Sequence, residues 1–158
     1  MSPHAPRVID PKDLADYLDV MARAVFQSGI SWSVIEAKWP GIAVAFDGFD
    51  PEKVAAYTPD DIERLMGDTA VVRNRKKIEA IIGNAGELIV ADREFGGFEK
   101  YLGSFPDNDA LVKDLHKRFA FLGPSVAHFF LFAVGWDMPA QEAWAREHFA
   151  GHDPRDRK

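Results

Sequence analysis

The stretch KRFAFLGPSVAHFFLFAVG, residues 117–135, decides the fold class. Its second part, Ser125–Val134, is strongly apolar over a helical length. The residues before it, Asp109–Arg118, predict another helix, so the FAFLGPS segment between the two is a short apolar connection. The sequence therefore predicts two helices joined by a tight turn, with Gly123 and Pro124 at its tip.

Outside this stretch the apolar residues also recur at helical spacing, and no sustained alternation indicates a strand. Residues 73–92 predict the longest helix. Asp50-Pro51 and Thr58-Pro59 each place a capping residue before a proline, a typical helix start. The sequence therefore predicts an all-α protein of roughly eight to ten short helices. The other expected helices start at Asp10-Pro11, cover residues 31–39 and 42–46 on either side of Pro40-Gly41, and cover residues 98–102 and 139–149.

Composition fits a single packed domain, since 47% of the 158 residues are hydrophobic and 28% are charged. We expect a flexible arm over residues 1–10, one helical domain over residues 11–150 and a charged tail over residues 151–158. The absence of cysteine excludes a disulfide scaffold, a thiolate nucleophile and a Cys-ligated metal. No apolar run reaches the roughly 18 residues of a membrane helix, and no signal core opens the chain, so a cytoplasmic protein without membrane contact is predicted.

Basic residues gather in two places, although the formal net charge of −6 by itself argues against a nucleic-acid partner. Lys113, Lys117 and Arg118 precede the tight turn, whose tip can direct the first N–H groups of the next helix toward an anion. These are the parts of a helix–hairpin–helix element, which grips a DNA phosphate without reading sequence; a plain turn between helices is the alternative.

A second basic cluster opens the helix over residues 73–92, where the helix dipole disfavours cations. It indicates either a bound anion or a solvated basic face paired with Asp60, Asp61 or Asp68. The cluster consists of Arg73, Arg75, Lys76 and Lys77.

The segment FQSGISW, residues 26–32, combines a flexible turn with an aromatic ring. Gly29 permits close backbone approach, and Trp32 supplies a flat ring at a helix start. Such a ring beside a pocket can stack on a nucleobase that has been turned out of a duplex. Packing in the core is the alternative reading of Trp32.

These motifs together resemble the DNA-3-methyladenine glycosylase I family of the helix–hairpin–helix DNA glycosylase superfamily. The family's FQAGLSW, AFxxFDPxxVA and RNRxKIxAxxxNA are recognisable in this order within residues 26–85, and residues 117–135 resemble its helix–hairpin–helix region. The resemblance covers about residues 12–136. It implies a compact all-α fold that binds double-stranded DNA with a damaged base, turns the base out, and hydrolyses its N-glycosidic bond with water and no cofactor.

The resemblance also implies which residues act in a monomeric enzyme. Phe26, Gln27 and Trp32 line the base pocket. Ser125 stands where strand-cleaving relatives carry a Schiff-base lysine, which implies a monofunctional hydrolase. The residues that hold the DNA phosphates are Gly123, Ser125, Lys117, Arg118, Arg73 and Lys76.

The chain departs from the family at positions that recognise the base and bind zinc. The glutamate that hydrogen-bonds the flipped adenine is Ala24 here, and the first 25 residues contain no YHDxEWG motif. The family's C-terminal His and Cys ligands have no counterparts, so no metal is expected. Glu142, seven residues after Gly135, falls about where superfamily enzymes carry an aspartate that supports the developing sugar cation. The alternative for Glu142 is a surface acid on the last helix.

Three functions are therefore weighed. The first is a glycosylase that excises an alkylated purine such as 3-methyladenine. The second, favoured by Ala24, is a catalytically inactive relative that binds damaged or distorted DNA. The third is a protein-binding or small-molecule module, supported only by the net charge of −6. A basic stripe through Arg73, Lys76 and Lys117 would favour DNA over the third function.

Overall fold

The computed structural model describes residues 10–136, and over this range it contains eight α-helices, one short 3-10 helix and no strand. The all-α fold expected from the sequence is confirmed. The expected arm before residue 10, the helix over residues 139–149, Glu142 and the tail over residues 151–158 lie outside the described residues. The elements are α1 (Leu14–Gln27), α2 (Trp32–Ala45), η1 (Asp47–Phe49), α3 (Pro51–Ala55), α4 (Pro59–Met66), α5 (Arg75–Phe95), α6 (Phe98–Leu102), α7 (Asn108–Arg118) and α8 (Pro124–Ala133).

Capping residues set several of these helix starts. The side chains of Asp50 and Thr58 accept backbone N–H groups at the starts of α3 and α4, as the sequence predicts. The predicted start of the first helix at Asp10-Pro11 is wrong, because Asp13 caps α1 by accepting from the N–H of Asp16 at 3.0 Å.

The sequence predicts that Pro40-Gly41 ends or bends the second helix, and an end there, with a separate helix over residues 42–46, is wrong. The second helix continues through Pro40 as one element, α2, from Trp32 to Ala45. Pro40 is exposed, so water can replace the hydrogen bond that its missing N–H removes.

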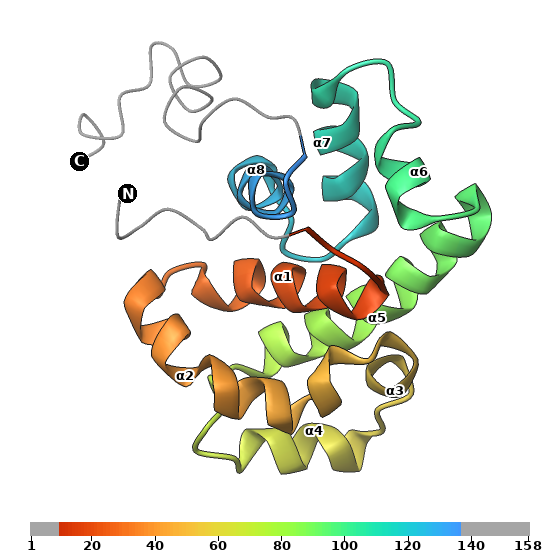
Figure 1. Cartoon of the computed structure of the whole chain (residues 1–158). Helices are drawn as coiled ribbons and strands as arrows, with labels where there is room; N and C mark the ends of the chain where they lie inside the picture. The colour runs from red at the N-terminus through yellow and green to blue at the C-terminus, as the bar shows by residue number, and fades with distance from the viewer. Residues whose placement is uncertain (1–9, 137–158) are drawn as a thin grey trace.

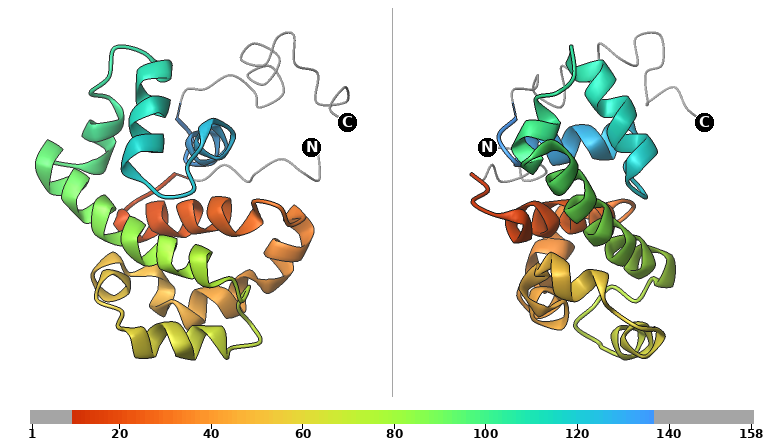
Figure 2. Two further views of the ribbon diagram at one scale, coloured as in Figure 1. Left: turned by 180° about the vertical axis from the view of Figure 1, so that it is seen from behind. Right: turned by 90° about the vertical axis from the view of Figure 1, so that its right-hand side faces the viewer.

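Helix α1 lies between two groups of helices (Figure 1), with α2–α4 on one side and α6–α8 on the other. The longest helix, α5, crosses α1 and reaches both groups (Figure 2), with contacts to α1, α3, α4 and α6. The face that α1 presents to these neighbours is fully buried, including Leu18, Met21, Ala24 and Phe26. The core is therefore built around α1, and α5 joins its two sides.

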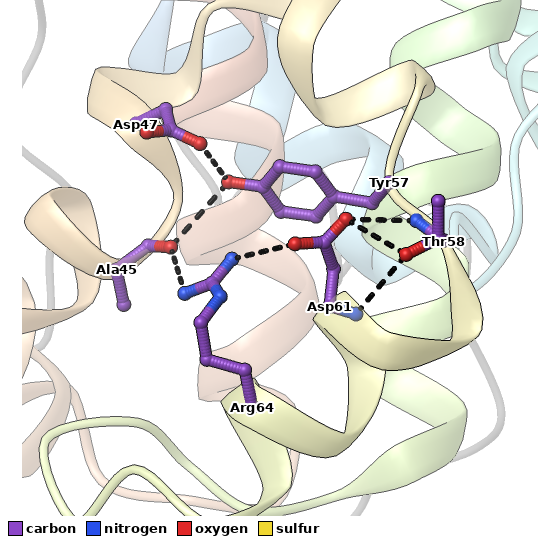
Figure 3. Close-up of polar contacts among 6 residues, drawn as sticks. All are labelled: Ala45, Asp47, Tyr57, Thr58, Asp61 and Arg64. Atoms are coloured by element: carbon purple, nitrogen blue, oxygen red, sulfur yellow. Dashed lines mark hydrogen bonds and ion pairs between the residues drawn. The ribbon is translucent and has the colours of Figure 1, made fainter.

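A polar network fixes the turn that follows α2 (Figure 3). All three residues of η1, Asp47–Phe49, have a positive φ, which is a strained conformation for the two that are not glycine. The hydroxyl of Tyr57 donates to Oδ2 of Asp47 at 2.5 Å, and Nη1 of Arg64 donates to the carbonyl of Ala45 at 3.0 Å. These contacts hold α4 against the end of α2.

The same kind of tyrosine–aspartate contact occurs on the other side of α1, where the hydroxyl of Tyr101 donates to Oδ2 of Asp114 at 2.5 Å. Burial, and then the hydrogen bond to an aspartate, raise the pKa of both Tyr57 and Tyr101 above the usual value. The folded protein therefore keeps both phenols protonated to a higher pH than the unfolded chain does.

We expect the free energy of unfolding to fall as the pH rises above about 10, the pKa of an unfolded tyrosine. Below that pH the raised pKa values contribute fully to the free energy of unfolding. Above it the unfolded chain releases its phenol protons more readily than the folded protein, and this stabilises the unfolded chain. Tyr57→Phe and Tyr101→Phe should each weaken this alkaline dependence. Urea unfolding between pH 8 and 11 measures it, and slopes unchanged from wild type in both variants would contradict the assignment.

Candidate functional site

The turn between α1 and α2 forms one wall of a cleft. Gly29 has a φ of 83°, a left-handed conformation that favours glycine, and the N–H of Ile30 donates to the carbonyl of Gln27 at 2.9 Å. Ser31 then caps α2 by accepting from the N–H of Val34. The cleft has a volume of about 440 Å³, and its lining comprises residues 27–31 together with Ser125 and Val126 of α8. The structure thus brings Gln27 and Ser125 into one cleft.

The two aromatic candidates differ in their surroundings. Trp32 is half-buried at the start of α2, and its ring lies 5.4 Å from the ring of Phe129 in α8. Phe26 is fully buried, with its ring 5.9 Å from Phe46 and 6.3 Å from Trp39. The structure places Phe26 in the core, and neither Phe26 nor Trp32 is among the residues that line the cleft.

Ala24 is also fully buried within α1. It lies outside the lining of the 440 Å³ cleft. Its methyl group supplies no hydrogen-bonding atom, so any polar contact to a bound base has to come from other residues.

The connection between α7 and α8 is the tight turn that the sequence predicts. Phe121 has a φ of 64° and a side chain that is 43% exposed, whereas the neighbouring Leu122 is buried. Gly123 has an ordinary φ of −64°, and a Cβ atom added to it would meet nothing within 4 Å. Nothing within the described protein therefore requires glycine at position 123, and the space beside it is open.

The start of α8 presents backbone donors. No side chain among residues 10–136 caps this helix, and its first turn carries no acidic residue. The first N–H groups of a helix have no partner within the helix, so they and the helix dipole favour an anion. Ser125 is exposed in this first turn and also lines the cleft.

The candidate cations fall into two classes. Three cations, Arg73, Lys76 and Lys117, are exposed. None of their side chains has a hydrogen bond or ion pair to another residue within the range 10–136. Arg73 also lines a second cleft of about 550 Å³, which shares Ile30 with the first. These three cations are free of internal carboxylates in the described part of the chain.

Arg118 is different because its side chain is only 19% exposed and its guanidinium already faces carboxylates. It also lies 5.2 Å from the ring of Tyr101. The carboxylate partners are Asp114 at 3.4 Å, Glu87 at 3.5 Å and Glu94 at 3.8 Å. These contacts hold α7 against α5, so the structure gives Arg118 a packing role.

The basic cluster at the start of α5 is not one surface. Arg75 pairs with Glu63 at 2.5 Å, and not with the three aspartates suggested by the sequence. Lys77 points inward and is only 7% exposed, with its Nζ donating to backbone carbonyls in the turn after α1. Sequence reasoning grouped Lys77 with the other cations of the cluster and missed the buried Asn84, which contacts the α7–α8 turn. Their seven-residue spacing along an apolar helix face is the signal that could have found them.

Two general features can be stated for the described range, residues 10–136. No helix there is long and apolar enough to cross a bilayer. Nor do three or more His, Cys, Asp or Glu side chains gather there in an arrangement that could hold a metal ion.

Comparison with known proteins places the chain in a family. The sequence model described as methyladenine glycosylase matches residues 9–115. The chain is 34% identical over 130 residues to DNA-3-methyladenine glycosylase 1 of Escherichia coli (strain K12). This alignment covers 69% of this chain and 70% of that relative.

Solved structures agree. 3-Methyladenine DNA glycosylase I from Staphylococcus aureus aligns with a TM-score of 0.73 and 32% identity, over 85% of this chain and 83% of that chain. A variant of 3-methyladenine DNA glycosylase I in complex with 3-methyladenine aligns with a TM-score of 0.74 and 31% identity, over 87% and 86% of the two chains. The class defined by these matches is a helical DNA glycosylase, a hydrolase of N-glycosyl bonds. Within this class the chain belongs to the methyladenine glycosylase family, so the family expected from its motifs is confirmed.

The positive φ of Phe121 makes a direct prediction about stability. We expect Phe121→Gly to be more stable than Phe121→Ala by about 1 kcal/mol, since a Cβ atom strains a left-handed residue. Both variants lose the same exposed ring, so the pair isolates the backbone. Urea unfolding midpoints measure the difference. Equal midpoints would show that the turn relaxes to another conformation without cost.

Proposed function

We propose that this protein turns an alkylated purine out of double-stranded DNA and hydrolyses its N-glycosidic bond with water, in base excision repair. The observation that supports this most directly is the cleft where the turn after α1 meets the first turn of α8. A candidate base-binding residue, Gln27, and a candidate phosphate-binding residue, Ser125, line the same cleft. The names of the relatives point to 3-methyladenine as the base.

The base would be held by groups around this turn. Trp32 offers a ring for stacking, and the amide of Gln27 offers a donor and an acceptor for the edge of the base. 3-Methyladenine is cationic in DNA and a good leaving group, so its release needs little acid catalysis. Glu142 is our candidate for the carboxylate that supports the sugar cation, and it lies outside the described residues.

The phosphates would be held by the first turn of α8 and by nearby cations. Gly123 leaves open space for a close approach, and Ser125 adds an exposed hydroxyl. Lys117 lies near the end of α7, before the turn that leads into α8, and Arg73 and Lys76 add two exposed cations at the start of α5. We leave Arg118 out of this set because three carboxylates already surround it.

A second function is favoured by one observation, the fully buried Ala24 at the family's glutamate position. A protein without that carboxylate could bind damaged DNA and excise nothing. Release of a base in a single turnover separates the two functions. The monomeric state and the cytoplasmic location stay predictions.

The proposed pocket is tested by single-turnover base release from methylated duplex DNA, with the released purines separated and identified. We expect wild type to release 3-methyladenine and Trp32→Ala to release none, because the base loses its stacking partner. Affinity for duplex DNA should stay mostly intact in Trp32→Ala. Trp32→Phe keeps an aromatic ring and should retain part of the rate. Equal loss of release and DNA affinity in Trp32→Ala would place Trp32 outside the base pocket.

The proposed phosphate contact is tested by Gly123→Ala. Its φ is ordinary and its Cβ position is empty, so stability should be unchanged or slightly raised. Affinity for duplex DNA should fall, since the added methyl group occupies the space of the approaching phosphate. Gly83→Ala is the matched control, because Gly83 in α5 also has nothing within 4 Å of an added Cβ.

The dependence of DNA affinity on salt provides a further check of these contacts. Affinity should weaken steeply as salt is raised, because phosphate contacts release counterions. If affinity does not change with salt, or if Gly123→Ala binds as tightly as Gly83→Ala, the start of α8 is not the phosphate site.

A further inference from the structure

Helix α5 carries two buried polar side chains that bind the backbone of turns far away in the sequence. Lys77 is 7% exposed and Asn84 is 2% exposed. Lys77 binds the turn between α1 and α2, and Asn84 binds the turn between α7 and α8. One helix is thus attached to the turn that lines the cleft and to the turn that leads into α8, whose residues Ser125 and Val126 line its other side.

Lys77 binds on both sides of Gln27. Its Nζ donates to the carbonyl of Phe26 at 3.1 Å and to the carbonyl of Ser28 at 2.6 Å. Helix α1 ends at Gln27, and its last turn contains no basic residue of its own. The carbonyls at a helix C-terminus are unsatisfied and partly negative, so an ammonium group from another helix stabilises them.

The ammonium of Lys77 has no carboxylate within 4 Å in the range 10–136. Burial lowers the pKa of Lys77, because removing the cation from water disfavours the charged form. Without a carboxylate partner, the buried cation is held by its hydrogen bonds to the two carbonyls. What the cation provides is a defined position for the backbone around Gln27.

Asn84 binds the second turn through both ends of its amide. Its Nδ2 donates to the carbonyl of Ala120 at 3.1 Å, and its Oδ1 accepts from the N–H of Ala120 at 2.8 Å. Ala120 directly precedes the left-handed Phe121 and lies three residues before Gly123. Two bonds to the backbone of one residue, Ala120, fix both the place and the direction of this turn relative to α5.

We propose that α5 fixes the distance between the base-binding turn and the phosphate-binding turn through Lys77 and Asn84, which act as positioning residues for excision. This inference rests on the proposed function. The two residues are two helical turns apart, about 10 Å along the helix axis. A rigid helix between the turns holds the base pocket at a constant distance from the contacts to the DNA phosphates. A base can enter that pocket only if the phosphates of its strand are bound at the right distance from it.

The test uses two variants that remove the hydrogen bonds and keep the volume, Lys77→Met and Asn84→Leu. Three quantities are measured on the full chain: binding of free 3-methyladenine, affinity for duplex DNA, and the single-turnover rate of base release. We expect Lys77→Met to weaken free-base binding and to slow release by about tenfold to a hundredfold, with duplex affinity unchanged. We expect Asn84→Leu to weaken duplex affinity by about tenfold and to leave free-base binding unchanged.

Matched variants guard against a general loss of stability. Arg75→Gln removes a neighbouring cation that pairs with Glu63, and it should leave all three quantities as in wild type. Lys77→Arg keeps the charge and the donors, and it should recover part of the release rate lost in Lys77→Met. If Lys77→Met does not fold, a normal rate in a folded Lys77→Gln overturns the proposal, and a reduced rate with normal duplex affinity supports it.

Amide hydrogen exchange tests the positioning independently of activity. Exchange should accelerate over residues 28–31 in Lys77→Met and over residues 119–123 in Asn84→Leu, each without a change in the other turn. If wild type releases no base yet exchange follows this pattern, the proposed function fails and the attachment of the two turns stands. If each variant loses base binding and duplex affinity together, or if neither variant changes any quantity, the positioning roles are overturned.

Discussion

The burial of α1 is the constraint on which the rest of the structure depends. Helices pack against it from two sides, and Leu18, Met21, Ala22 and Val25 have no exposed surface. The carbonyls of Phe26 and Ser28 lie at its C-terminal end, the first on a fully buried residue and the second on a half-buried one. They need a donor from the protein, and Lys77 of α5 supplies it. The position of the cleft wall after α1 thus follows from the packing of the core.

The same constraint explains why Ala24 fits this chain. Small side chains let α1 approach the helices that pack on it, and α1 contacts both α5 and α8. A glutamate at this fully buried position would need space and partners for a carboxylate. The core packs around the methyl group of Ala24, so alanine in place of glutamate at position 24 alters the packing as well as the chemistry. Under the proposed function, the polar contacts to the base are therefore expected from the turn at Gln27–Ser31.

Most of the fold could be predicted from the sequence, because caps and apolar spacing are local signals. Thr58 and Asp50 start their helices as expected, and α6 has the predicted bounds. The errors came where solvent or a distant partner decides the outcome. Pro40 fails to end α2 because it faces water, and Lys77 was grouped with surface cations because its carbonyl partners precede it by about fifty residues. The motifs assigned Gln27 to the base pocket and Ser125 to the phosphates, but no local pattern could show that both line one cleft or assign Arg118 its three carboxylates.

The net charge of −6 is a weak argument against DNA binding, because several of the acidic residues are bound within the fold. Asp13, Asp50 and Asp107 cap helices, where the positive end of the dipole and the backbone N–H groups neutralise them. Other acids are paired with internal arginines such as Arg118. Arg73, Lys76 and Lys117 have no such partner in the described range, so the surface field near them is more basic than the sum of charges indicates. A phosphate backbone responds to that local field within about 10 Å, the Debye length at 0.1 M salt, and not to the total.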